Sequence, residues 1–260
     1  MHDQNFKFED GEAYEQTMGI WSQLVGFKFL QWLSPSINQR WIDVGCGNGA
    51  FTEQIVKNYK PSEVQGIDPS DDQIYFAKNR PGVQTATFQI GDAMALPFES
   101  DQFDFATMAL VIRFVPDPAQ GVAEMKRVVR PGGAVAGYVW DSIGGGMPHE
   151  PIQAELRSMS LKYPRPPSAE ASNLEVLQKL WVDAGLRSVE TQIITAERTF
   201  ASFENFWSLS SNSQTLQSVL EDLDPATLGQ LKSSIQARLT AETNGQITCS
   251  AHVNAIKGLV

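Results

Sequence analysis

Short apolar runs that favour strands alternate with amphipathic stretches that favour helices between residues 41 and 141. Such alternation produces right-handed βαβ units, and consecutive units build a parallel sheet with helices on its faces. This part of the chain is therefore predicted to be an α/β core. The expected strands are 41–45, 64–68, 85–92, 103–110 and 134–141, and the expected helices are 49–59, 70–79 and 117–129.

The flanking segments lack this regular alternation. Two short helices are expected within 11–33, and two more at 150–162 and 173–184, the last ending at Gly185. Two strand-like runs, 189–200 and 246–258, enclose a mostly helical stretch. The prediction is one domain over 1–260, made of cap helices in 1–39, a core in 40–141, and further core strands in 142–260 with a helical lid at about 202–240.

Composition limits the classes of partner and compartment. The formal charge of −10 repels phosphate backbones, so a nucleic-acid partner is not expected. Cys46 and Cys249 are the two cysteines, and their lack of Cys/His clustering argues against a structural zinc ion and fits a reducing compartment. The polar N-terminus has no signal pattern, and the apolar stretch 20–33 is too short and polar to span a bilayer. A cytoplasmic protein without a membrane partner is predicted, and its oligomeric state stays open.

A glycine-rich segment, Asp43-Val-Gly45-Cys-Gly47-Asn-Gly49, lies between the first expected strand and the first expected helix. Glycines at such a junction let the backbone turn sharply and approach a ligand closely, because no Cβ intervenes. A tight turn without a ligand is the alternative. The third glycine comes one residue earlier than in the GxGxxG fingerprint of dinucleotide-binding oxidoreductases, which disfavours that class.

Acidic residues close the next two expected strands. Asp68 ends the second strand, and a carboxylate at that edge can accept hydrogen bonds from both hydroxyls of a ribose. Its alternative role is to cap the following helix. Asp92 ends the third strand, where its carboxylate and the amide of Ala93 can bind an adenine edge; the alternative is a solvated loop acid.

Five segments carry a family resemblance. In this order they resemble the motifs of class I S-adenosylmethionine-dependent methyltransferases, in particular the bacterial methyltransferase type 11 group: DVGCGNG, GIDPS, GDAMALPF, FDFATMALVIRFVPDP and EMKRVVRPGG. The resemblance implies a Rossmann-like, seven-stranded sheet whose last strand is antiparallel, with S-adenosylmethionine bound over the carboxyl ends of the strands. It also implies methyl transfer to a small molecule by in-line displacement, releasing S-adenosylhomocysteine.

The resemblance also assigns residues to the cofactor. Asp43, Gly45 and Gly47 would border its methionine and ribose portions, and Asp68 would take the ribose hydroxyls. The remaining positions divide between adenine and sulfonium. The residues implied near the adenine are Pro69, Asp92 and Ala93, and those beneath the methionine portion and sulfonium are Ala109 and Leu110.

Acceptor contacts are less well defined by the sequence. Ile20 and Arg113 depart from the residues expected in relatives, a basic residue and a His or Asn, and Arg113 would place a fixed charge near the acceptor. Further candidates are aromatic residues that lie near the expected site or on a helical face of the lid, although each has a core-packing alternative. These candidates are Tyr14, Trp21, Trp140 and Trp207.

No catalytic residue is assigned, because methyl transfer can proceed without a general base when the acceptor is already nucleophilic. His149 follows a GGG segment and is expected to be a solvated loop histidine rather than an essential base. His252 is expected to be structural. Asp141 either orients the acceptor or caps a turn. A protein that binds the cofactor without turnover stays an alternative, because no single residue is obligatory for the reaction.

Overall fold

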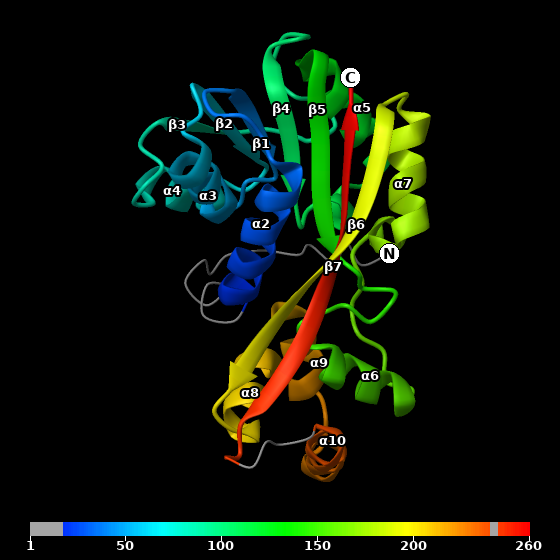
Figure 1. Cartoon of the computed structure of the whole chain (residues 1–260). Helices are drawn as coiled ribbons and strands as arrows, with labels where there is room; N and C mark the ends of the chain where they lie inside the picture. Colours follow the sequence, from blue (N-terminus) through cyan, green and yellow to red (C-terminus); the bar gives the residue numbers. More distant parts are fainter. Residues whose placement is uncertain (1–17, 240–243) are drawn as a thin grey trace.

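The computed structural model describes residues 18–239 and 244–260, which build a seven-stranded sheet with helices on both faces (Figure 1). The strand order is β3-β2-β1-β4-β5-β7-β6. The first five strands pair in parallel, whereas β7 is antiparallel to both β5 and β6. The predicted Rossmann-like sheet with an antiparallel last strand is therefore confirmed.

The strands begin and end close to the expected positions. The near-continuous burial of β1, β4 and most of β5 reflects a sheet that is covered by helices on each face. The bounds are Arg40–Val44 for β1, Glu63–Asp68 for β2, Ala86–Ile90 for β3, Phe103–Ala109 for β4, Val129–Trp140 for β5, Arg187–Phe200 for β6 and Ile247–Leu259 for β7.

The start of β5 differs from the prediction, because the strand begins at Val129 rather than at residue 134. The segment 130–133 contains Pro-Gly-Gly, which from the sequence alone predicts a turn. In the structure it stays in the sheet through an irregularity of the β4–β5 register between Phe103 and Phe105, with Gly132 at a φ of +80°. A bulge of this kind absorbs residues that a regular ladder excludes.

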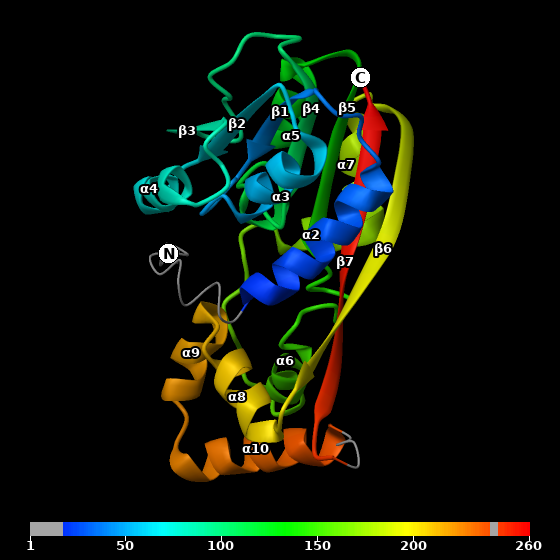
Figure 2. The ribbon, with the colours of Figure 1, turned by 60° about the vertical axis from the view of Figure 1, so that its left-hand side comes forward.

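Helices cover the two faces of the sheet in separate groups. Helices α2 and α3 pack on one face, in a large cluster that includes Trp41 and Tyr138, and α4 packs beside them over Phe88 (Figure 2). Helices α5 and α7 pack on the other face with Val135 and Ile256. The bounds are α2 Ile20–Leu33, α3 Ala50–Tyr59, α4 Asp71–Asn79, α5 Pro118–Val128 and α7 Leu174–Asp183.

The N-terminal expectation is only partly covered by the described residues. Of the two short helices expected within 11–33, the described part holds the single helix α2 from Ile20 to Leu33. The remainder lies outside the described residues, as does Tyr14. Helix α2 is apolar on most sides and buries Trp21, Val25 and Phe29 against the sheet.

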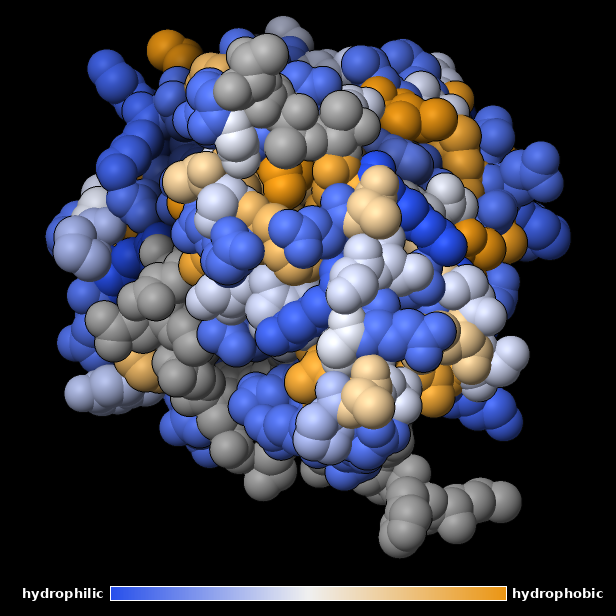
Figure 3. Space-filling view, turned by 90° about the horizontal axis from the view of Figure 1, so that it is seen from below, coloured by the Kyte–Doolittle hydropathy of each residue, from blue (hydrophilic) through white to orange (hydrophobic). Residues whose placement is uncertain are grey.

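A lobe extends beyond the carboxyl ends of the parallel strands. Strand β7 leaves β5 at the pair Trp140–Val253, and from there to Ile247 it pairs with β6 alone. This two-stranded ribbon carries three helices, as expected for a mostly helical lid, and α6 packs against the last of them. The bounds are α6 Glu150–Ser158, α8 Phe203–Ser211, α9 Gln214–Glu221 and α10 Pro225–Arg238. Seen from this end, the surface is mainly hydrophilic with small scattered apolar groups (Figure 3).

Helix α6 ends at Ser158, earlier than the predicted residue 162. Ser160 adopts a φ of +59°, and the Leu161 amide donates to the Leu156 carbonyl at 2.8 Å. This six-to-one hydrogen bond is the pattern by which a Schellman motif ends a helix, here without the glycine that normally signals it.

Gly66 tests how tightly the sheet packs under α4. A Cβ on Gly66 would lie 2.4 Å from Phe88 Cδ1 and 3.0 Å from Cys46 Sγ, so Gly66→Ala should lower the unfolding free energy by about 1–3 kcal/mol. Gly229→Ala is the matched control: nothing lies within 4 Å of its added Cβ in exposed helix α10, so it should stabilise by about 0.4–1 kcal/mol. Urea unfolding measures the unfolding free energy of both variants. Equal changes in Gly66→Ala and Gly229→Ala would contradict the tight packing around Gly66.

Candidate functional site

The loop between β1 and α3 is held at the carboxyl edge of the sheet by one carbonyl. The Ile67 oxygen accepts from the amides of Gly45 at 2.7 Å and Cys46 at 2.9 Å. Gly45 has a φ of +74°, and a Cβ there would lie 2.5 Å from Val111 Cγ2. Position 45 therefore requires glycine, both for its backbone conformation and for its contact with the chain that follows β4.

Gly47 differs from Gly45 in what surrounds it. Its φ is +52°, and the nearest atom to an added Cβ would be Gln73 Oε1, at 3.6 Å. Among the residues that the structure describes, no atom packs tightly against this side of the loop. That a ligand approaches the backbone at Gly47 closely stays a prediction from the glycine-rich sequence.

Asp43 lies at the base of this loop and is fully buried. Its Oδ2 accepts from Thr52 Oγ1 at 2.6 Å, whereas its Oδ1 has no hydrogen-bond partner. Burial raises the pKa of Asp43 from its usual 3.8 to about 7, with a smaller contribution from the negative charge of Asp68. A buried acceptor atom without a partner is costly, and it is the kind of atom that a bound cationic ligand can satisfy.

Asp68 ends β2 beside the same loop. Its Oδ2 accepts from the Gly47 amide at 3.0 Å, and its Oδ1 accepts from the Ser70 amide at 2.9 Å. Helix α4 is capped by Ser70, whose hydroxyl accepts from the Gln73 amide. The capping role that was the alternative for Asp68 thus belongs to Ser70. Burial raises the pKa of Asp68.

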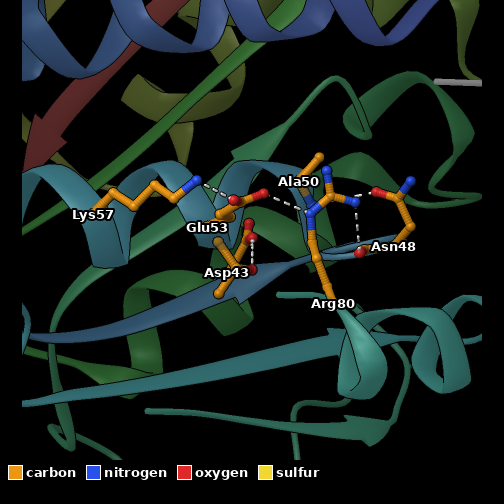
Figure 4. A network of polar contacts seen from close by, with 7 residues as sticks. Asp43, Asn48, Ala50, Glu53, Lys57 and Arg80 are labelled. Atoms are coloured by element: carbon orange, nitrogen blue, oxygen red, sulfur yellow. Dashed lines mark hydrogen bonds and ion pairs between the residues drawn. The ribbon is translucent and has the colours of Figure 1, made fainter. Parts of the chain in front are cut away.

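A polar network braces the outer side of the loop (Figure 4). Arg80 Nε donates to Glu53 Oε2 at 2.8 Å, and its Nη1 donates to the Asn48 carbonyl at 3.4 Å. Glu53 also forms an ion pair with Lys57. Sequence reasoning missed this network, since Arg80 lies 32 positions from Asn48 and no local motif joins them.

The residues assigned to the adenine side lie around the ends of β2 and β3. Asp92 is exposed, and its Oδ1 accepts from the Met94 amide at 2.8 Å. Ala93 is half-buried against the core, and Pro69 is exposed beside Asp68. The described fold thus brings these positions to the same edge as the glycine loop.

The end of β4 carries a strained residue. Leu110 has a φ of +66°, which is uncommon for a side chain of this size, and its amide donates to the Tyr138 carbonyl at 2.7 Å. Ala109 and Leu110 are half-buried beside Val111, which contacts Gly45. Backbone strain held by surrounding structure is frequent at functional sites.

The proposed acceptor residues separate into buried and half-buried ones. Trp21 and Trp140 are each 2% exposed, whereas Arg113 and Trp207 are half-buried. Arg113 lies in a short 3₁₀ helix, η2 (Ile112–Phe114), directly after β4. Trp207 packs near Phe203 and beneath Lys232 Nζ, 4.8 Å from its ring centre.

His149 is a correction to the sequence analysis. It is 4% exposed rather than solvated, and it is the N-cap residue of α6 instead of lying in a flexible loop. Burial, with a smaller contribution from the Arg113 charge, lowers its pKa from 6.5 to about 3. His252 Nε2 lies 3.3 Å from Asp141 Oδ2, and Asp141 Oδ1 accepts from the Gly144 amide, so these two residues hold the loop after β5.

Two further properties concern the described residues, 18–239 and 244–260. No three His, Cys, Asp or Glu side chains come together there as a set of metal ligands. No helix in the described parts of the chain has both the length and the apolar character needed to cross a membrane.

The sheet order, the glycine loop, Asp43 near the end of β1 and Asp68 at the end of β2 are those of the class I S-adenosylmethionine-dependent methyltransferase fold. Residues 42–137 match the family model described as "Methyltransferase domain", so this stretch of the chain is similar to that family. Demethylmenaquinone methyltransferase of Staphylococcus aureus (strain JH9) is 33% identical over 127 residues, 48% of this chain and 51% of the relative. The chain thus spans about half the length of the curated relatives that it matches.

Solved structures support the fold. A putative methyltransferase from Bacillus halodurans C-125 superposes with a TM-score of 0.58 at 19% identity, over 90% of this chain and 97% of that one. Phosphoethanolamine N-methyltransferase 2 from Haemonchus contortus, solved with S-adenosyl-L-methionine, gives a TM-score of 0.58 at 20% identity. The superposition covers 95% of this chain and 56% of that one. At these identities the likeness concerns the fold.

Asp43 makes stability depend on pH. The native carboxyl keeps its proton up to about pH 7, whereas the unfolded one loses it near its usual pKa of 3.8. Between these values the native state binds more protons, so the unfolding free energy should fall as pH rises, by up to about 1.4 kcal/mol per pH unit. Asp43→Asn should remove this slope. Denaturant unfolding from about pH 4.5 to 8 measures it, and parallel profiles for both proteins would contradict the shift.

Proposed function

We propose that this protein binds S-adenosylmethionine at the β1–α3 loop and transfers its methyl group to a small-molecule acceptor. The observation that carries the proposal is the pairing of two acids across one loop. Asp68 holds the Gly47 amide, and Asp43 keeps one buried oxygen without a partner beneath the same loop. A ligand with ribose hydroxyls and a cationic amino group matches both acids.

Different residues at this edge of the sheet would bind different parts of the cofactor. Asp68 would accept hydrogen bonds from the ribose hydroxyls with the lone pairs that Gly47 and Ser70 leave available. Asp43 and the Gly45–Gly47 backbone would face the methionine portion, where the ammonium charge favours the ionised form of Asp43. Pro69, Asp92 and Ala93 would hold the adenine, and Ala109 and Leu110 would lie beneath the sulfonium.

The cofactor, when bound, supplies an activated methyl group on a sulfonium centre. What the protein contributes is position: it holds the acceptor in line with the methyl carbon and the sulfur, and it excludes water. His149 does not fit a general base, because an imidazole with a pKa of about 3 is a weak proton acceptor at neutral pH.

Acceptor identity does not follow from the relatives. The family model ends at residue 137, before Trp140, His149 and the lobe on β6 and β7. Trp21, Trp140, Arg113 and Trp207 stay proposed acceptor contacts. Trp207 in α8 also contacts α10, because Lys232 Nζ lies over its ring. The cytoplasmic location likewise stays a prediction, which the buried free thiols of Cys46 and Cys249 support.

Ligand-induced stabilisation tests the function directly. S-adenosylmethionine and S-adenosylhomocysteine should stabilise the protein by about 2.7 kcal/mol at a hundred times their Kd, which raises the Tm by roughly 5–10 °C. NAD and NADP are the controls and should leave the Tm unchanged. Stabilisation by NAD together with no response to either sulfur compound would exclude the proposal.

Asp68 provides the matching variant. Asp68→Ala removes charge-assisted hydrogen bonds worth about 1.5–3 kcal/mol each, so S-adenosylhomocysteine should bind at least about tenfold more weakly. Titration calorimetry measures this affinity, and circular dichroism checks that the variant is folded. Asp71→Ala, in the first turn of α4 beside the cap, is the control and should bind normally. Wild-type affinity of Asp68→Ala would assign Asp68 to the scaffold.

A further inference from the structure

The β3–β4 connection, residues 91–102, carries two of the proposed adenine contacts and follows an irregular path. It leaves Ile90 at the carboxyl edge of the sheet and reaches Phe103 at the opposite edge, and β2 and β1 lie between the two strands that it joins. The connection forms no helix, and within it only an isolated bridge joins Asp92 to Ala95. Its backbone groups lack the partners that a helix or a sheet supplies, so another part of the protein has to bind them.

A polar stripe on α5 supplies these partners. Gln120, Glu124 and Arg127 lie at positions i, i+4 and i+7, so they share one side of the helix. Gln120 Nε2 donates to the Met94 carbonyl at 3.2 Å. Glu124 Oε2 accepts from the Leu96 amide at 2.8 Å, and Arg127 Nη2 donates to the Leu96 carbonyl at 2.9 Å. The stripe therefore binds the connection at successive points along its length.

Arg127 and Glu124 also bind each other. Arg127 Nε donates to Glu124 Oε1 at 2.7 Å, and its Nη2 donates to Glu124 Oε2 at 2.8 Å. These hydrogen bonds hold the pKa of Glu124 below its usual value, so both side chains are charged at neutral pH. Arg127 Nη1 donates to the Phe98 carbonyl at 2.8 Å, and the exposed Glu99 carboxylate adds a weaker attraction. A planar guanidinium can make all these contacts at once, whereas a lysine cannot.

The same contacts reach the proposed adenine residues. Asp92 Oδ1 accepts from the Met94 amide at 2.8 Å, and the Asp92 carbonyl accepts from the Ala95 amide at 3.1 Å. These two hydrogen bonds close a turn that contains Ala93. Leu96 follows the turn directly, and its amide and carbonyl are both bound by side chains of α5. The orientation of the turn therefore depends on contacts made by α5.

We propose that Glu124 and Arg127 are positioning residues for adenine recognition. They hold the turn at 92–95, so that the Asp92 carboxylate and the Ala93 amide face one edge of the base. This deepens the proposed function and rests on it. Adenine presents an amino donor beside the N1 acceptor, and hypoxanthine presents an oxygen acceptor beside an N1–H donor. A carboxylate next to an amide N–H fits the first order and opposes the second, provided that the turn is held in place.

Two ligands measure this discrimination. S-adenosylhomocysteine carries adenine, and S-inosylhomocysteine carries hypoxanthine in its place. The wild type should bind the first at least about tenfold more tightly, because the second leaves both contacts unsatisfied. Arg127→Gln should reduce this ratio of affinities at least about threefold, mainly by weakening the adenine compound, and Arg127→Lys should keep part of it. Titration calorimetry measures both affinities.

Arg130→Gln is the matched control. The Arg130 side chain is 43% exposed, against 35% for Arg127, and it forms an ion pair with Asp104 at the opposite edge of the sheet. This variant loses the same charge, and its ratio should stay that of the wild type even where its stability falls. Glu124→Gln and Gln120→Ala remove fewer contacts and should lower the ratio to a smaller degree. They carry the test if Arg127→Gln does not fold.

A double variant examines whether the pair acts through Asp92. Asp92→Asn keeps an acceptor for the Met94 amide, but its amide group can also donate to the hypoxanthine oxygen, so the ratio should fall. In this background Arg127→Gln should lower the ratio little further, because the contact that Arg127 positions is already changed.

Several results would overturn the positioning role. These are an unchanged ratio in folded Arg127→Gln, an equal fall in Arg130→Gln, or a fall that is fully additive with that of Asp92→Asn. Equal binding of the two ligands by the wild type would overturn it together with the adenine assignment. Absence of S-adenosylhomocysteine binding by the wild type would refute the proposed function itself, whereas normal binding with an unchanged ratio in Arg127→Gln would refute only the role of α5.

Discussion

One carbonyl oxygen, that of Ile67, determines where the functional edge of this protein lies. It accepts from both Gly45 and Cys46 and so binds the loop after β1 to the end of β2. On the other side, Val111 occupies the space that a side chain at position 45 would need. The loop is thereby held between the ends of β2 and β4, at the reversal of strand order where doubly wound sheets bind ligands.

This placement has an energetic consequence for Asp43. The loop and α3 cover a carboxylate whose second oxygen has no partner, although Thr52 satisfies the first. The folded protein therefore keeps a buried carboxylate oxygen without a partner within β1, in the parallel part of the sheet. Such a local violation of the rules of packing is expected where a site is arranged for a ligand rather than for stability.

The parts that the sequence predicted well are those whose signal is local. Strands and helices of the core follow from periodicity, and the glycine loop follows from residues next to one another. The start of β5 was missed because the Pro-Gly-Gly segment is held beside the sheet by hydrogen bonds between Gly132, Gly133 and the distant residue Val260. The burial of His149 and the bracing of Asn48 by Arg80 were missed because both depend on contacts between distant segments.

The difference between local and long-range signals also applies to the site, whose cofactor half and proposed acceptor half are built differently. The cofactor half is built from consecutive β-loop-α units, so related chains can preserve it as a short sequence pattern, and the family model covers residues 42–137. The acceptor half, as proposed, would combine the ends of β4 and β5 with the lobe carried on the β6–β7 ribbon beyond Val253. We propose that its specificity depends on which buried groups lack an internal partner, and the Trp140 indole is one such group. A site that binds an acceptor through such groups rejects molecules that leave them unsatisfied, so acceptor choice can change while the cofactor half stays the same.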